Sequence, residues 1–149
     1  MKILLAIDDS QFSEAALQMV LTRYRHEGTE VRVLHVVEPI ALAVPPFMVE
    51  GYAPQLDEVR QEQLKQAQEL VAQAAEKLLA AGFLADTAVV EGNARGEIVD
   101  LAAEWHADLI VVGSHGRKGL DRFLLGTVSD FVARHALCSV EIVRLPANP

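Results

Sequence analysis

Two glycine-containing segments in the last third of the chain could bind a phosphate group. In the first segment Gly113 and Gly116 flank two residues, and in the second Gly126 stands directly before Thr127. Glycine lets a backbone approach a ligand closely and take a positive φ angle, and successive backbone N–H groups can then form a concave anion site. We therefore expect residues 113–116 to form half of a phosphate-binding site.

The second segment is predicted to open a helix, because Thr127 and Asp130 have the spacing of a capping box. A helix N-terminus offers free N–H groups and the positive end of the helix dipole to an anion. Arg117, Lys118 and Arg122 add positive charges between the two segments. A glycine-rich turn that merely joins a strand to a helix is the simpler alternative, but a second segment of this kind favours phosphate binding.

Two better-known nucleotide motifs are excluded. The chain has no Gly-x-x-x-x-Gly-Lys-Ser/Thr loop, and Gly113, Gly116 and Gly119 do not follow the Gly-x-Gly-x-x-Gly spacing of a dinucleotide fold.

Composition limits the class of protein further. The 149 residues are 51% hydrophobic and 23% charged, which excludes an intrinsically disordered chain and fits one domain, 1–149. The net charge of −8 disfavours a nucleic-acid partner, because nucleic-acid backbones bind basic surfaces. Any attraction for phosphate must therefore be local.

The N-terminus and the apolar runs predict a cytoplasmic protein with no membrane contact. The unbroken apolar runs, such as 3–7 and 109–112, are far shorter than the roughly 20 residues of a membrane-spanning helix, and residues 1–9 lack the pattern of a signal peptide. Cys138 is the only cysteine, so no intrachain disulfide can form, and it is expected to be a small buried hydrophobic residue.

Strands and helices alternate along the predicted chain. Apolar runs predict strands at 3–7, 31–37, 87–90, 109–112 and 140–143, and helical spacing predicts helices at 12–20, 56–81, 97–105 and 127–135. Ser10 or Ser13 can cap the first helix. This order predicts an open five-stranded parallel α/β sheet with helices on both faces, a Rossmann-like fold. Ligands bind such sheets beyond the carboxyl ends of the strands, where Asp8 and the 113–119 loop lie.

The connection 38–55 is unusually long for a compact domain and is both apolar and rich in proline. We interpret it as a lid or a subunit contact, with a segment that simply packs on the surface as the alternative.

From Lys2 to Arg144 the chain resembles the universal stress proteins of the nucleotide-binding kind, most clearly in the runs 3–8, 34–38 and 108–116. The most specific part is the ATP signature of that family, which is Gly, two residues, Gly, nine residues, Gly and a small hydroxyl residue. Gly113, Gly116, Gly126 and Thr127 match it without a departure in spacing. The resemblance implies an adenine-nucleotide α-hydrolase-like fold with strand order 3-2-1-4-5.

The resemblance also implies where each part of the nucleotide lies. The adenine is expected near Ala6, Asp8 and Val36, at the ends of the first two strands, with the aspartate reaching the adenosine. The ribose and phosphates are then expected along Val112, Gly113, His115 and Gly116, with Gly126, Thr127, Val128 and Ser129 on the other side.

Family members commonly form homodimers through the last strand, where they often have the sequence Pro-Val-Leu-Val-Val. In this chain Ser139 replaces the proline and Glu141 replaces an apolar residue. A charge that faces its symmetry mate would repel it, so the expected homodimer is weaker or different in shape.

The leading hypothesis is an ATP-binding regulatory protein of the stress response that acts by binding and has an unidentified protein partner. ATP, with or without Mg²⁺, is the first choice of ligand, and ADP, AMP and cyclic AMP remain open. The alternative is a slow ATP hydrolase or an autophosphorylating phosphotransferase. For that chemistry Asp121 and Asp130 could assist a metal, Ser114 or Ser129 could accept a phosphoryl group and His115 could act as a base. These residues form no recognisable catalytic constellation, and the intact glycine signature disfavours a module that binds no nucleotide.

Overall fold

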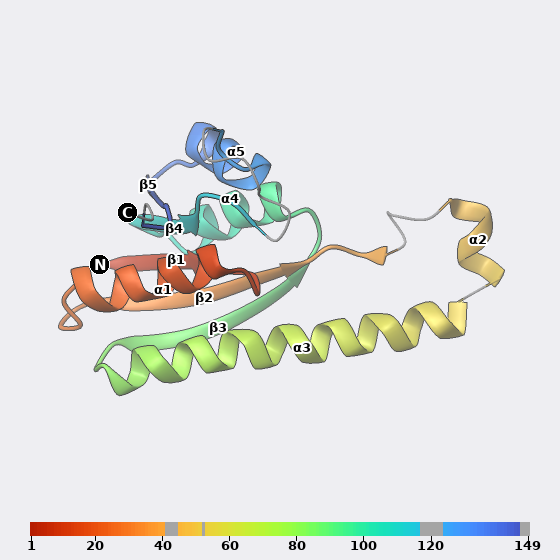
Figure 1. Ribbon diagram of the computed structural model, residues 1–149, viewed down its shortest axis with the longest axis horizontal. Coiled ribbons are helices and arrows are strands. Elements are labelled where there is room, and N and C mark those ends of the chain that lie inside the picture. Colours follow the sequence, from red (N-terminus) through yellow and green to blue (C-terminus); the bar gives the residue numbers. More distant parts are fainter. Residues whose placement is uncertain (41–44, 52, 117–123, 147–149) are drawn as a thin grey trace.

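Five parallel strands form the sheet at the centre of the molecule (Figure 1). The computed structural model describes residues 1–40, 45–51, 53–116 and 124–146. Every neighbouring pair of strands is parallel, and their spatial order is β3-β2-β1-β4-β5, as predicted. The strands are β1 (Lys2–Ala6), β2 (Glu30–Val37), β3 (Leu84–Glu91), β4 (Leu109–Gly113) and β5 (Ser139–Val143).

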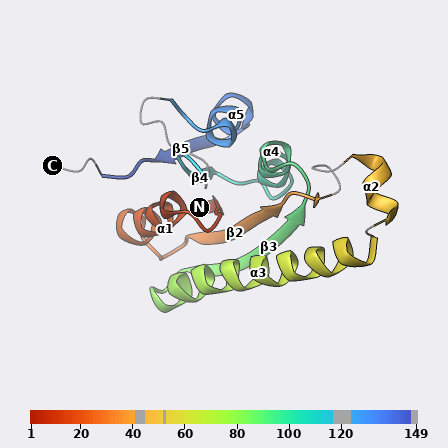
Figure 2. The same cartoon turned by 45° about the vertical axis from the view of Figure 1, so that its right-hand side comes forward.

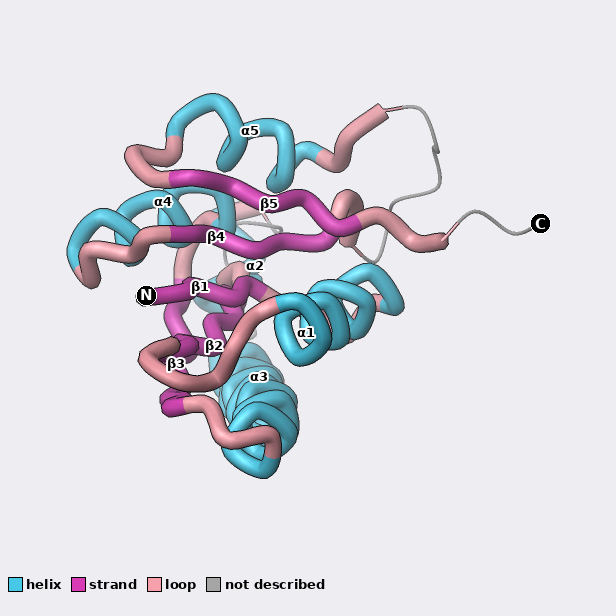
Figure 3. The backbone as a smooth tube through the Cα atoms, turned by 90° about the vertical axis from the view of Figure 1, so that its left-hand side faces the viewer, coloured by secondary structure: helices cyan, strands magenta, loops and turns pink. Residues whose placement is uncertain are grey.

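Helices cover both faces of this sheet (Figures 2 and 3). The helices α1 (Gln11–Arg23) and α3 (Ala53–Ala80) lie on one face, and α4 (Ala94–Glu104) and α5 (Thr127–His135) lie on the other. Successive residues of a strand point to opposite faces, so Ile3 and Leu5 join the core under α1 and α3, while Leu4 and Ala6 join the core under α4 and α5. Burial on both sides therefore explains why residues 3–6 of β1 are all apolar.

The first helix begins as one of the two predicted caps requires. The Ser10 hydroxyl accepts the backbone N–H of Ser13 at 3.3 Å, so Ser10 is the N-cap. Ser13 instead lies inside the molecule with 7% of its surface exposed, where it contacts the end of β1.

The predicted capping box at the start of α5 is wrong. Gly126 is the N-cap residue, Thr127 is already helical, and among the described residues no side chain makes a capping hydrogen bond to this helix. A Cβ atom at position 126 would lie 3.1 Å from the Ser114 carbonyl oxygen and 3.2 Å from the His115 Cα. This crowding favours glycine at the cap, and the Arg134 Nε–H donates to both oxygens of the Asp130 carboxylate at 3.1 Å.

Part of the predicted 38–55 loop is helical. Residues 46–51 form α2 (Pro46–Gly51), and α3 begins at Ala53 rather than at 56. Proline suits the first position of a helix, because its missing N–H would have no partner there. These residues extend beyond the sheet, and the Phe47 side chain is 77% exposed (Figure 1). The role of the segment as a lid or subunit contact stays a prediction, since 41–44 and 52 lie outside the described residues.

The amino end of the sheet is closed by polar contacts around Trp105. The Lys2 ammonium lies 5.2 Å from the centre of the Trp105 ring, and the Arg32 guanidinium lies 4.6 Å from it. Arg32 also makes two hydrogen bonds of 2.8 and 2.7 Å to Asp86, and the Lys2 N–H donates to Asp108 at 2.7 Å.

A search of the described helices finds no segment with the length and hydropathy of a membrane span.

Candidate functional site

A cleft of about 1130 Å³ opens at the carboxyl ends of β1, β2 and β4. The chain leaves β1 toward β2 and leaves the adjacent β4 toward β5, so the two connections run to opposite sides of the sheet, which is the usual ligand position in an open parallel sheet. Arg117, Lys118 and Arg122 lie outside the described residues. Every other residue predicted to contact the nucleotide lines the cleft, namely Ala6, Asp8, Val36, Val112, Gly113, His115, Gly116, Gly126, Thr127, Val128 and Ser129.

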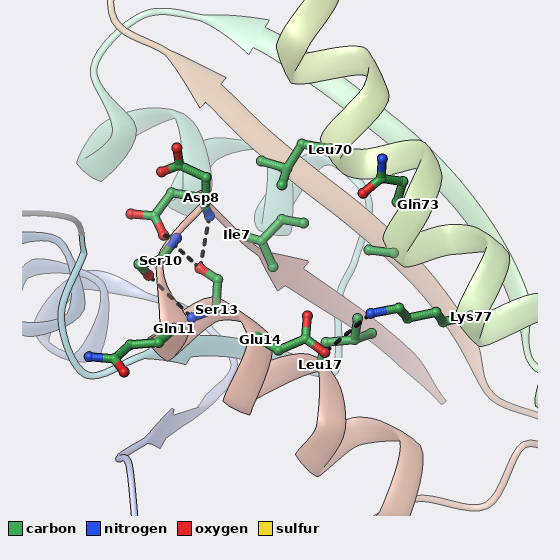
Figure 4. Close-up of a pocket in the computed structure, with 12 residues that line it drawn as sticks. Ile7, Asp8, Ser10, Gln11, Ser13, Glu14, Leu17, Leu70, Gln73 and Lys77 are labelled. Atoms are coloured by element: carbon green, nitrogen blue, oxygen red, sulfur yellow. Dashed lines mark hydrogen bonds and ion pairs between the residues drawn. The ribbon is translucent and has the colours of Figure 1, made fainter.

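The Asp8 side chain is held by the first turn of α1 (Figure 4). Its Oδ1 atom accepts the Ser10 N–H and the Ser13 hydroxyl, both at 2.9 Å, while the Ser13 Oγ accepts the Asp8 N–H at 2.8 Å. These bonds fix the carboxylate plane and direct Oδ2 toward Gly116, where a Cβ atom would lie only 2.8 Å away. Asp8 Oδ2 is thus the atom that can accept a hydrogen bond from a ligand hydroxyl.

His35 fixes the backbone just before Asp8, a role that the sequence did not reveal. The Ile7 N–H donates to the Leu34 carbonyl at 2.8 Å, and the His35 Nδ1 lies 2.6 Å from the Ile7 carbonyl oxygen. A carbonyl only accepts, so Nδ1 carries the proton. The pairing of β1 with β2 therefore continues past the last strand residue and sets the position of Asp8.

Gly113 and Gly116 matter because neither has a Cβ atom, which leaves room for neighbouring atoms to come close. A Cβ atom at Gly113 would meet the Phe12 Cβ at 2.7 Å and the Phe12 carbonyl carbon at 2.9 Å. Gly113 therefore lets α1 approach β4, whereas Gly116 leaves room beside Asp8. Neither glycine has a positive φ, so that part of the prediction was wrong; the described glycines with positive φ are Gly28, Gly82 and Gly92.

The start of α5 forms the opposite wall of the cleft. The helix's own bonds begin with the Asp130 N–H, which donates to the Gly126 carbonyl at 3.0 Å. The N–H groups of Thr127, Val128 and Ser129 precede that first bond and add to the positive end of the helix dipole. This wall can bind an anion without a charged side chain.

The described side chains that were considered for phosphoryl transfer are buried or make contacts within the protein. The two ring nitrogens of His115 lie 3.0 Å from the Ser114 Oγ and 2.5 Å from the Leu124 carbonyl oxygen. Ser114 and Ser129 are 2% and 3% exposed. Asp121 lies outside the described residues. Within the described ranges no three His, Cys, Asp or Glu side chains gather in a way that could hold a metal ion.

Helix α3 contributes a wall that the sequence analysis missed. Gln63, Gln66, Leu70 and Gln73 line the cleft from this helix. They stand beside the buried residues of α3, and only the tertiary fold shows that this second stripe faces a cleft. The wall is held in place by Arg60, which makes hydrogen bonds of 2.9 and 2.7 Å to Glu91 at the end of β3.

A smaller cavity of about 420 Å³ continues from the cleft between α1 and α3 (Figure 4). Ile7, Leu17 and Leu70 supply its apolar part. Lys77 spans from α3 to Glu14 on α1 at 3.2 Å. Hydrogen bonds from Gln18 and Lys77 hold the pKa of Glu14 below its usual value, so this contact remains an ion pair.

Glu141 and Cys138, the two C-terminal residues that the sequence analysis singled out, both contact other parts of the same chain. Glu141 was expected to repel its copy across a dimer, but its carboxylate accepts bonds of 2.7 Å from Arg23 and 2.5 Å from the Tyr24 hydroxyl within the same chain. Cys138 is half-buried against the core under α4 and α5, and burial raises the pKa of its thiol.

Known proteins match this chain over nearly its whole length, both in sequence and in fold. A profile described as the universal stress protein family matches residues 1–144. YxiE of Bacillus subtilis is 34% identical over 145 residues, covering 96% of this chain and 98% of its own. Sll1388 of Synechocystis is 32% identical over 149 residues, covering 96% and 97%. The solved structure of MJ0577 has a TM-score of 0.85 at 28% identity, covering 99% of this chain and 97% of its own; MJ0577 comes from Methanocaldococcus jannaschii.

Other solved structures of the same fold hold adenine nucleotides. A universal stress protein from Arabidopsis thaliana has AMP bound, with a TM-score of 0.71 at 20% identity, 99% of this chain and 93% of that chain being covered. One from Archaeoglobus fulgidus is a complex with dAMP, with a TM-score of 0.69 at 23% identity and coverage of 96% and 97%. A third universal stress protein is a complex with cAMP, with a TM-score of 0.65 at 22% identity and coverage of 96% and 95%.

Proposed function

The chain belongs to the universal stress protein family, and we propose that it binds an adenine nucleotide, ATP in the first instance, within a single domain of residues 1–149. One observation carries this proposal. The residues that the family resemblance implies for nucleotide binding come from the carboxyl ends of β1, β2 and β4 and from the start of α5, and all those described line one cleft. A packing role alone would not require them to meet at one opening.

The geometry supports a specific assignment of the ligand's parts. We assign the adenosine to Ala6, Asp8 and Val36, where the Asp8 Oδ2 atom is the acceptor for a ribose hydroxyl. The phosphates are assigned to the segment 113–117, which includes Arg117, and to the N–H groups of residues 127–129. Phosphate oxygens only accept hydrogen bonds, and a helix N-terminus supplies only donors.

Relatives of the same fold support the class of ligand. Complexes with AMP, dAMP and cAMP are known for other universal stress proteins. The cleft of about 1130 Å³ is slightly larger than the roughly 300–1,000 Å³ common for small-molecule sites, so it has room for a triphosphate. Mg²⁺, if present, would enter with the phosphates, because Mg²⁺ usually keeps waters and binds one or two carboxylates plus substrate phosphates.

We propose regulation by binding rather than by turnover. Phosphoryl transfer needs a residue that orients the nucleophile next to a positioned metal. The most suitable base, His115, has both ring nitrogens engaged with Ser114 and Leu124. A slow hydrolase or autokinase is the alternative, and it predicts repeated turnover.

The proposal is tested by the ligand that the native protein carries. Protein purified under native conditions is denatured, and the released small molecules are identified by chromatography and mass. The same preparation is incubated with Mg-ATP, and its nucleotides are followed for hours. We expect an adenine nucleotide in near-stoichiometric amount, and ATP that stays intact.

The other outcomes separate the alternatives. ADP that accumulates over many turnovers, and stops accumulating in Thr127→Val, would make the protein an enzyme. Release of AMP, ADP or cyclic AMP would change the nucleotide but keep the site. No released nucleotide and no uptake of ATP, ADP, AMP or cyclic AMP would end the proposal.

We further propose that the protein is a cytoplasmic homodimer that pairs through β5 and has a protein partner still to be identified. β5 is an edge strand, and its residues are exposed or partly exposed. The bonds of Glu141 to Arg23 and Tyr24 neutralise the charge that would oppose such pairing. Light scattering after size-exclusion chromatography tests this: a mass of one chain at micromolar concentration would contradict it.

A further inference from the structure

The two predicted phosphate-binding segments are joined to each other by the Ser114 carbonyl group. This oxygen accepts the Gly126 N–H at 2.8 Å and the Ser129 hydroxyl at 2.9 Å. The Gly126 bond fixes the residue that caps α5, and the Ser129 bond fixes its first turn. Both bonds connect the end of β4 with the start of α5 across the sequence between them.

The Ser129 hydroxyl has its proton committed to the protein. A hydroxyl has a single proton to donate. The Ser129 Oγ lies 2.9 Å from the Ser114 carbonyl oxygen and 3.1 Å from the Gly126 carbonyl oxygen, and both of these atoms only accept. Ser129 is 3% exposed and Ser114 is 2% exposed, so water does not replace these bonds easily. The hydroxyl cannot donate to a phosphate oxygen while it keeps this arrangement.

These bonds of Ser114 to Gly126 and Ser129 form a junction between the two segments. The junction is also bonded to the sheet, so its position does not depend on α5 alone. The Ser114 N–H donates to the Val143 carbonyl at 2.8 Å, which ties it to the end of β5. The His115 ring adds a second link, because its nitrogens contact the Ser114 Oγ and the Leu124 carbonyl. Leu124 lies just before α5, so the ring connects the same two segments.

We propose that Ser129 is a positioning residue for the nucleotide phosphates and not a phosphate ligand through its hydroxyl. By donating to Ser114, it holds the N–H groups of residues 127–129 at a fixed distance from Gly113 and Gly116 before a ligand arrives. Groups held in place beforehand lose less conformational freedom on binding. The inference rests on the proposed function for its ligand, but the ligand-free protein tests the junction by itself.

The test compares Ser129→Ala with Ser129→Thr and with the control Thr22→Ala. The Thr22 hydroxyl also donates to a helix carbonyl, that of Gln18 at 2.8 Å, on the exposed side of α1. In each variant, NMR measures amide hydrogen exchange at Gly126 without ligand, and calorimetry measures the Kd of ATP and of adenosine.

We expect Ser129→Ala to raise Gly126 exchange about tenfold and the ATP Kd about tenfold, as the loss of one net hydrogen bond implies, with the adenosine Kd within about twofold. Ser129→Thr restores the hydroxyl and should restore both values, and Thr22→Ala should change neither.

Three results would overturn the inference. An unchanged Gly126 exchange with weakened ATP binding would make the hydroxyl a direct phosphate ligand. No change in either quantity would remove any role for Ser129. Equal losses for ATP and adenosine would indicate general damage to the cleft. If the natural protein binds neither ATP nor adenosine, the proposed function fails, while the exchange of Gly126 still decides whether the junction exists.

Discussion

The polar groups at the two ends of the sheet differ in where their hydrogen-bonding atoms point. At the amino end, Arg32 pairs with Asp86, the Lys2 N–H donates to Asp108, and Lys2 and Arg32 lie beside the Trp105 ring. At the carboxyl end, the Asp8 Oδ2 atom and the first N–H groups of α5 face a cleft instead. Parallel strands alone do not cause this difference, because each strand contributes to both ends.

This difference implies that the polar groups at the amino end contribute to stability, while those at the carboxyl end contribute to ligand binding. Groups that are satisfied within the protein contribute to the free energy of unfolding, and their loss leaves a partner unpaired. Groups that face a cleft keep their donors and acceptors for a ligand. Substitutions at the amino end should therefore lower stability and spare binding, while substitutions at the carboxyl end should do the reverse.

The largest effect should come from Gly116→Val, which fills the space beside Asp8. A Cβ atom there would meet the Asp8 Oδ2 at 2.8 Å, so the acceptor must move away from the ligand, and the valine side chain also occupies cleft space assigned to the phosphates. We expect the Kd of ATP, measured by calorimetry, to rise about 1,000-fold, roughly 4 kcal/mol. Chemical denaturation should show a change of less than about 1 kcal/mol in stability.

Gly96→Ala is the matched control for that substitution. Gly96 lies in α4, and a Cβ atom there meets no other atom within 4 Å. Alanine should stabilise the helix by about 0.5–1 kcal/mol and leave the ATP Kd unchanged. If Gly116→Val unfolds the protein, the separation of stability from binding fails at this position.

Trp105→Ala should have the next largest effect, and of the opposite kind. The ring packs against the core under α4 and α5 and lies near Lys2 and Arg32. Its loss should lower the free energy of unfolding by about 3 kcal/mol, the sum of lost burial and two cation–π contacts. The ATP Kd of the folded variant should stay within about twofold; a larger change would mean that the two ends are coupled.

Asp8→Asn should weaken binding moderately. Asparagine can keep the Oδ1 bonds to Ser10 and Ser13, but it replaces the acceptor at Oδ2 by a donor. The ATP Kd should rise about tenfold, since one charge-assisted hydrogen bond is lost, and the Kd of 2′-deoxy-ATP should rise less. Asp100→Asn, on the exposed side of α4, is the control, and an equal loss for both nucleotides would exclude a contact between Asp8 and the ribose 2′-hydroxyl.

The smallest effect should be a pH dependence at the Tyr24–Glu141 contact, far from the cleft. Burial, and then the hydrogen bond to Glu141, raise the pKa of Tyr24 to about 12, against about 10 in an unfolded chain. The folded state thus favours the protonated phenol. The stabilisation is complete below about pH 10 and is lost as the pH rises from about 10 to about 12.

The size of that loss should be at most about 1 kcal/mol, because the contact is partly exposed to solvent. Tyr24→Phe removes the titrating group, so its stability should lack the extra alkaline loss. Denaturation curves of both proteins across this pH range give the difference directly. An identical alkaline loss in both would show that the hydroxyl contributes nothing.

Much of the fold was predictable because burial determines the spacing of apolar residues and the length of the apolar runs in strands and helices. β1 and β4 read as continuous apolar runs since both of their faces are covered. β3 was predicted too short, at 87–90, because it is an edge strand: Leu84 is 67% exposed and Asp86 pairs with Arg32, so its first half lacks an apolar pattern. α2 was missed because Pro45 and Pro46 resemble a loop, although Pro46 begins the helix.

The site was predictable as a set of residues but not in its internal bonds. The glycine spacing located the segments, because spacing survives as a sequence pattern. The roles of Gly113, Gly126 and Ser129 depend on Phe12 and Ser114, which come close only in the folded chain. For the same reason Glu141 looked unpaired in the sequence, since its partners lie on α1.

The most direct test follows the backbone amides of ¹⁵N-labelled protein by NMR while ATP is added. Nucleotide binding at the carboxyl end predicts the largest chemical-shift changes at Asp8, Gly116 and residues 127–129. Lys2, Arg32 and Trp105 at the amino end should stay unchanged. Changes confined to the amino end, or no changes at millimolar ATP, would contradict nucleotide binding in this cleft.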